Sequence, residues 1–127
     1  MEKTNNTNLK SLIEGYSVEV IPKTVSKIDS FSEILPQKTR VYIAHLKDEG
    51  IEPMVAAAKR LSDEGFAAMP HIPARIIKNQ AMLNDWISMY KNEAGVNEAL
   101  LLAGGSPEPV GDYDSSIKLI ESGLFDK

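Results

Sequence analysis

The stretch GFAAM, residues 65–69, joins the end of a predicted helix to the start of a predicted strand. A glycine at such a position adopts the left-handed conformation that ends a helix, and the apolar residue after it packs back on the helix. Gly95 and Gly123 are each followed by an apolar residue in the same way. The three glycines therefore mark three helix ends, and the first two lead directly into predicted strands.

On both sides of these junctions, strand-like runs alternate with helical runs. The expected strands span residues 17–21, 40–45, 66–69 and 96–103. The expected helices are a short lead-in helix over 7–14, followed by helices over 25–35, 53–63, 80–92 and 115–122. Thr24 and Asn79 are suitable N-caps for two of them. Met54, Ala58 and Leu61 form one apolar stripe, at spacings typical of a helix.

Alternating strands and helices indicate a parallel sheet with right-handed crossovers. The strands begin roughly 23 to 30 residues apart, which is close to the repeat of a (β/α)₈ barrel. The sequence therefore predicts an α/β fold, a parallel (βα)₄ half of a TIM (β/α)₈ barrel with a short N-terminal helix. We expect one domain over residues 1–127, with 1–15 leading in and 16–127 carrying the four units. A small open doubly wound sheet is the alternative.

Composition narrows the function classes. The chain has 127 residues, 43% of them hydrophobic and 25% charged, as in ordinary globular domains. A formal charge of −4 provides no basic footprint for nucleic acid, and the absence of cysteine excludes disulfides and thiolate chemistry. Residues 1–8 lack the apolar core of a signal peptide, and apolar runs such as 99–103 are too short to span a bilayer. We expect a soluble cytoplasmic protein.

Functional loops of parallel α/β folds lie at the carboxyl ends of the strands. Glu19 is the most informative residue there, because it lies between two valines of a strand, where a carboxyl group is expected to be partly desolvated. Desolvation raises a carboxyl pKa, which suits a general acid or base. The alternative is a structural acid paired with a cation such as Lys23 or Arg40.

Both histidines are also expected at these strand ends. His71 follows the third strand. It either contacts a ligand or lies at the barrel rim with its hydrogen bonds made inside the protein. His45 is the weaker candidate for a functional role. A metal site made of Glu19 and the two histidines is only a minor alternative, and no metal is predicted. Gly104 and Gly105 offer backbone N–H groups to a phosphate or a flat ring, or simply provide the geometry of a turn.

Four motifs together resemble the methylenetetrahydrofolate reductase family. They are SVEVIPKT at 17–24, MPHI at 69–72, ALLLAGGSP at 99–107 and DYD at 112–114. They resemble, in order, the family's first-strand motif, its third-strand Pro-His motif, its fourth-strand turn and the segment before its fourth helix. The resemblance runs from about residue 16 to 127 and covers the first half of the family's barrel.

The resemblance implies a (β/α)₈ barrel that binds FAD, accepts a hydride from NAD(P)H and reduces methylenetetrahydrofolate to methyltetrahydrofolate. Glu19 would then be the catalytic acid, and His71 and Tyr113 would contact the flavin, with Gly104 and Gly105 at the cofactor turn. Where the family pattern has Arg-Gly-Asp, this chain has alanine followed by the two glycines, and its first-strand motif has one proline instead of two. These departures are typical of a divergent branch.

Half a barrel would leave two sheet edges unpaired and one sheet face without helices. We therefore expect the chain to associate with itself, most simply as a dimer that completes eight strands. Folate and a nicotinamide cofactor are the expected small-molecule partners of the enzyme; nucleic acid and membranes are not expected. The alternative function is a non-catalytic half-barrel module whose main property is self-association.

Overall fold

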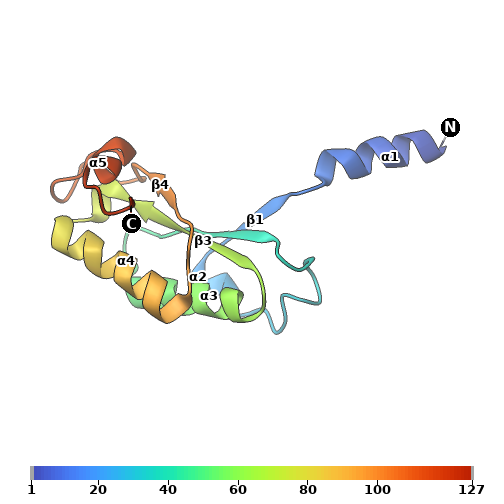
Figure 1. Ribbon diagram of the computed structural model, residues 1–127, viewed down its shortest axis with the longest axis horizontal. Helices are drawn as coiled ribbons and strands as arrows, with labels where there is room; N and C mark the ends of the chain where they lie inside the picture. The colour runs from blue at the N-terminus through green and yellow to red at the C-terminus, as the bar shows by residue number, and fades with distance from the viewer. Residues whose placement is uncertain (1, 127) are drawn as a thin grey trace.

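The computed structural model describes the backbone of residues 2–126 and the side chains of residues 8–126. Figure 1 shows a long N-terminal helix projecting away from a body of strands and helices. The elements, in chain order, are α1 (Glu2–Ile13), β1 (Ser17–Val20), α2 (Pro22–Val25), β2 (Arg40–Ile43), α3 (Ile51–Asp63), β3 (Ala67–Pro73), the 3₁₀ helix η1 (Ala74–Ile76), α4 (Gln80–Ala94), β4 (Leu100–Leu102) and α5 (Ser116–Glu121).

The four strands form one sheet in the order β1-β2-β3-β4, and every neighbouring pair is parallel. Glu19 lies opposite Tyr42, which in turn lies opposite Met69. β3 pairs with β2 up to Pro70 and with β4 from His71 onward. The predicted parallel α/β fold is confirmed, and the consecutive strand order has no switch point of the flavodoxin type.

Helices α3 and α4 cover one face of this sheet (Figure 1). Alternate strand residues point towards the helices, among them the buried Val41 and Ile43 of β2. They meet apolar residues of α3 and α4, and the predicted stripe of Met54, Ala58 and Leu61 is fully buried. The hydrophobic core therefore lies between the sheet and the α3–α4 pair.

The predicted helix ends are confirmed at Gly65, Gly95 and Gly123, whose φ angles are 91°, 65° and 72°. Gly95 is the left-handed C-cap of α4, and at the other end of this helix the side chain of Asn79 accepts a hydrogen bond from the amide of Met82. Among residues 2–126, no helix combines the length and the apolar character needed to cross a bilayer.

The prediction of a helix over residues 25–35 is wrong. The structure has only α2 there, four residues that end at Val25, and the chain continues as turns. Ser26 is the C-cap of α2, and its hydroxyl donates to the carbonyl of Lys23 in the last turn of that helix. Arg60 of α3 binds the carbonyls of Val25 and Ile28 and donates to that of Asp29 at 3.1 Å. These carbonyls are therefore satisfied without a helix.

β1 and β2 are one and two residues shorter than predicted, and the last two strands differ more. β3 extends through Pro73, so the Pro-His segment lies within the strand and not in the loop after it. β4 is shorter than expected and covers only Leu100–Leu102, while residues 96–99 approach the sheet as an irregular segment. Prolines cannot donate to a strand ladder, and Pro70 lies where β3 changes its partner from β2 to β4.

We predict that Arg60→Ala lowers the free energy of unfolding by about 2 kcal/mol, because it leaves the partly buried carbonyl of Ile28 without a donor. It also removes the guanidinium from above the Phe31 ring, 5.3 Å from the centroid. Urea denaturation would measure the loss.

Lys59→Ala on the same helix is the matched control. Among the described residues Lys59 pairs with Asp63 alone, at the exposed surface, so its removal should change stability by no more than about 0.5 kcal/mol. Equal losses in the two variants would contradict the assigned role of Arg60.

Candidate functional site

A row of polar side chains lies on the sheet face opposite α3 and α4. Because successive strand residues alternate in direction, Glu19 and Tyr42 point away from the helices while their neighbours Val20 and Ile43 are buried beneath the sheet. His71 belongs to the same face, two residues beyond Met69 on β3. The uncovered face therefore gathers Glu19, Tyr42 and His71 from three adjacent strands.

Glu19 and His71 approach each other across the intervening strand. Glu19 Oε2 lies 3.5 Å from His71 Nε2. The Tyr42 ring stands edge-on to the His71 ring, with centroids 6.1 Å apart and an interplanar angle of 62°. The structure thus brings together two of the residues singled out from the sequence, although they are more than fifty positions apart in the chain.

The two partners differ in their exposure to water. The Glu19 side chain is 60% exposed, so the desolvation expected for it from the sequence is slight in this chain. The His71 side chain is only 12% exposed, and burial lowers its pKa below the ordinary value of 6.5. The Glu19 carboxylate raises the pKa of His71, and His45 lowers it, but burial is the largest influence. His71 is therefore mainly neutral at pH 7.

A neutral His71 can take either role towards a ligand. Its Nε2 atom is buried and has no hydrogen-bond partner among the described residues, because 3.5 Å to Glu19 is at the outer limit for such a bond. Neutral imidazole either donates or accepts at this nitrogen, depending on the tautomer. The pair can thus offer a carboxyl group and an unused imidazole nitrogen to one molecule bound on this face.

His45 has a structural role in the fold. Its Nε2 lies 2.8 Å from the carbonyl oxygen of Glu49, just before α3, and its ring stacks on Trp86 of α4 at a centroid distance of 5.0 Å. The residue is buried, on the helix-covered side of the molecule. Within the described part of the chain, no group of three or more histidine, aspartate or glutamate side chains could hold a metal ion.

The other predicted site residues lie in the loop between β4 and α5. Gly104 has a φ of 96°, and a Cβ added there would lie 2.9 Å from the Cβ of Pro73, so a turn requirement explains this glycine. Gly105 has open space where a side chain would begin. Tyr113 is buried, and burial, followed by the nearby Asp112, raises its pKa. Among the described residues, no hydrogen bond, ion pair or ring contact links this loop to Glu19 or His71.

Arg75, which we did not single out from the sequence, holds that loop in place. Its Nε donates to the carbonyl of Asp114 at 2.9 Å and its Nη1 to that of Ser106 at 3.1 Å. Its amide also donates to the carbonyl of Ala103 at 3.0 Å. The signal available in the sequence was a single cation inside the apolar run 72–77. Tyr42 was also missed, because a tyrosine in a strand is usually a packing residue.

No protein-family model matches this chain. The likeness to methylenetetrahydrofolate reductases therefore depends on the four motifs quoted above, and the roles it implies for Glu19, His71 and Tyr113 stay predictions.

We predict that His71 titrates below pH 6.5 and that Glu19→Gln lowers its pKa further, since the carboxylate is the group that raises it. The folded protein then binds this proton less readily than the unfolded chain. The contribution of His71 to the free energy of unfolding is therefore fully present above pH 6.5, and it decreases as the pH falls below that value. NMR titration of the His71 ring in the wild-type protein and in Glu19→Gln would measure the two pKa values.

Glu52→Gln removes an exposed carboxylate from α3 and serves as the control, with no change expected at His71. A His71 pKa above 6.5 would contradict burial as the largest influence on it, and an unchanged or higher His71 pKa in Glu19→Gln would contradict the pairing with Glu19.

Proposed function

We propose that this chain is one half of a flavin-dependent reductase barrel that resembles methylenetetrahydrofolate reductases, with Glu19 as its acid. The observation that carries the proposal is the approach of Glu19 to His71 on the uncovered sheet face. In a closed barrel this face would line the interior, and the catalytic residues of such barrels lie where the carboxyl ends of the strands open onto the rim. The family reaction is reduction of methylenetetrahydrofolate to methyltetrahydrofolate.

Assembly would supply the desolvation that Glu19 lacks in the single chain. A second set of strands across the uncovered face would exclude water from the carboxyl group, and burial favours its protonated form. A protonated Glu19 can donate to the substrate nitrogen that leaves when the methylene bridge opens. In this proposal His71, which is already buried, orients the carboxyl group or contacts the cofactor.

Two features of the chain fit a flavin. The buried Nε2 of His71 has no partner among the described residues and can meet a polar ring edge, and the open space at Gly105 allows a flat ring to approach the backbone. Tyr113 is the aromatic residue that the resemblance assigns to the flavin, although its ring is largely buried in the chain itself. FAD, when bound, would carry the hydride between nicotinamide and folate.

A second candidate function is self-association without catalysis. Within the described residues, β1 and β4 each pair with a strand on one side only. Large apolar side chains are exposed on α1 and in its link to β1, namely Leu9, Leu12, Ile13 and Tyr16, and at and after β4, namely Leu100, Ile117 and Ile120. Exposed apolar surface beside an unpaired strand edge is typical of an interface. Two copies related by a two-fold axis would give eight strands.

We predict that the protein retains FAD after unbound flavin has been removed by gel filtration, as measured by its visible absorbance. Glu19→Gln should lower methylenetetrahydrofolate reduction by at least about 100-fold, because a general acid typically contributes 10²–10⁴-fold. Reduction of the bound flavin by NAD(P)H should be unaffected. Glu52→Gln is the matched acid control and should keep both half-reactions.

Failure of the protein to bind FAD would contradict the reductase proposal. Undiminished folate reduction in Glu19→Gln would show that Glu19 is not the acid. Neither result bears on self-association, which has its own test.

We predict a mass in solution of twice the 14.0 kDa chain mass, measured by sedimentation equilibrium. Leu100→Arg places a charge on the exposed side of β4 and should give monomers, because a buried unpaired charge is costly. Leu46→Arg, in the loop after β2, is the control and should leave the dimer intact. A folded wild-type monomer at all concentrations would contradict both the dimer and the half-barrel proposal.

A further inference from the structure

The spacing of Glu19 and His71 fits two ligands of one tetrahedral metal ion. Glu19 Oε2 lies 3.5 Å from His71 Nε2, at the outer limit for a hydrogen bond. Two ligands of a tetrahedral zinc ion, each about 2.0–2.2 Å from the metal, are about 3.3–3.5 Å apart. Neighbouring ligands of an octahedral magnesium ion are only about 2.9 Å apart. The distance in this protein therefore matches the tetrahedral geometry.

The buried nitrogen of this pair is covered in part by its own partner. His71 Nε2 is closed to solvent and has no hydrogen-bond partner among the described residues. Glu19 Oε2 lies close enough to shield it, but the Glu19 side chain is 60% exposed. Rotation of this exposed side chain would open a path to the nitrogen, and the carboxylate would then bind the ion that enters.

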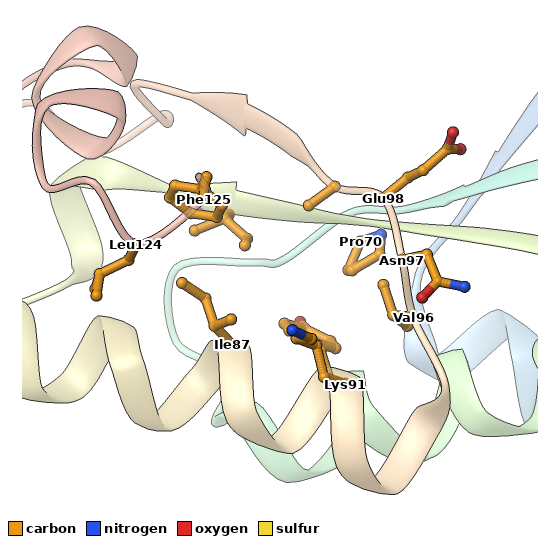
Figure 2. A pocket seen from close by; sticks show the side chains of 11 residues that line it. Pro70, Ile87, Lys91, Val96, Asn97, Glu98, Leu124 and Phe125 are labelled. Carbon is orange, nitrogen blue, oxygen red and sulfur yellow. The ribbon is translucent and has the colours of Figure 1, made fainter. Parts of the chain in front are cut away.

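β3 directs His71 to the sheet face opposite α3 and α4. On the helix side, Figure 2 shows Ile87 and Lys91 rising from α4 towards Pro70 of β3. His71 is the next residue of the strand and points the other way, because successive strand residues alternate in direction. Glu19 lies on the same face as His71, which is the face that a second half-barrel would cover.

One chain supplies only half of a zinc site. Structural zinc ions have four protein ligands. Within the part of the chain that the structure describes, no group of three or more histidine, aspartate or glutamate side chains could hold a metal. The remaining two ligands would have to come from a second molecule.

The offset between Glu19 and His71 is that of one layer of side chains in a barrel. Glu19 lies level with Met69, through Tyr42, and His71 is two residues further along β3. With a shear of about eight over eight strands, the register advances by about two residues between alternate strands. Each interior layer of such a barrel contains four side chains from alternate strands. A symmetric dimer would therefore place two copies of Glu19 and two of His71 in one layer.

The charges of this layer favour a divalent cation. Closure would bring two Glu19 carboxylates into an interior that excludes water, and burying like charges together is costly. Two carboxylates and two neutral imidazoles around Zn²⁺ leave no net charge. Imidazole nitrogen and carboxylate oxygen are both usual ligands of zinc.

We propose that two copies of this chain bind one zinc ion on their two-fold axis, held by Glu19 and His71 of both copies. The proposal rests on the self-association described above and does not require flavin. In this assembly Glu19 is a metal ligand and not an acid, so the zinc dimer develops the second candidate function and not the reductase.

Zinc binding to the full chain, without an added histidine tag, tests the proposal. Isothermal titration calorimetry should give one Zn²⁺ per two chains, and sedimentation equilibrium should show a dimer when the ion is bound. Co²⁺ in place of Zn²⁺ should give the strong visible absorption of a tetrahedral ion.

Glu19→Gln alters an exposed side chain and removes two of the four ligands, because both copies carry the substitution. It should weaken zinc binding by at least about 100-fold, since loss of a second-shell partner alone typically costs 10- to 100-fold. His71→Gln should weaken binding similarly without changing the charge of the neutral site, and circular dichroism would show whether it folds. Glu52→Gln, at an exposed position of α3, is the matched control and should keep the wild-type affinity.

A dimer that binds no zinc would overturn the metal site and leave self-association intact, whereas a monomer that binds no zinc would contradict both. One ion per chain, an octahedral cobalt spectrum or equal affinities of wild type and Glu19→Gln would show that zinc is held elsewhere, and each would overturn the proposal.

Discussion

The alternation of side chains along β3 is the constraint on which the rest of the structure depends. Pro70 and Ile72 point towards α4 and complete the core, whereas His71 points to the sheet face opposite α3 and α4. A shift of one residue in the pairing would exchange these sets, burying the histidine against α4 and exposing the core residues. The core and the candidate site are therefore fixed by the same register.

Two arginines hold the parts of the chain that lack regular structure. Arg60 binds carbonyls of the turns after α2, and Arg75 binds carbonyls of the loop between β4 and α5. A guanidinium has five N–H donors in a fixed plane, so one side chain can bind several carbonyls at once. Each arginine lies in a helix and binds an irregular segment that is about thirty to forty residues away in the chain.

Local signals in the sequence were sufficient for much of the fold. Glycine after a helix and asparagine before one act through the backbone next to them, so Gly65, Gly95 and Asn79 were interpreted correctly. The segment 25–35 was not, because its conformation depends on Arg60, more than thirty residues away. For the same reason the sequence singled out Glu19 and His71 separately but could not show their approach, which depends on strand register.

The N-terminal helix α1 makes few contacts with the rest of the molecule, and this affects its stability. It projects from the body (Figure 1), its apolar Leu9, Leu12 and Ile13 are exposed, and it joins β1 through Gly15 with a φ of 72°. A helix of 12 residues is only marginally stable in water without a surface to pack against. Its backbone amides should therefore exchange with solvent rapidly when α1 is uncovered and slowly once something covers it. Amide exchange in α1 would therefore report whether the chain has assembled.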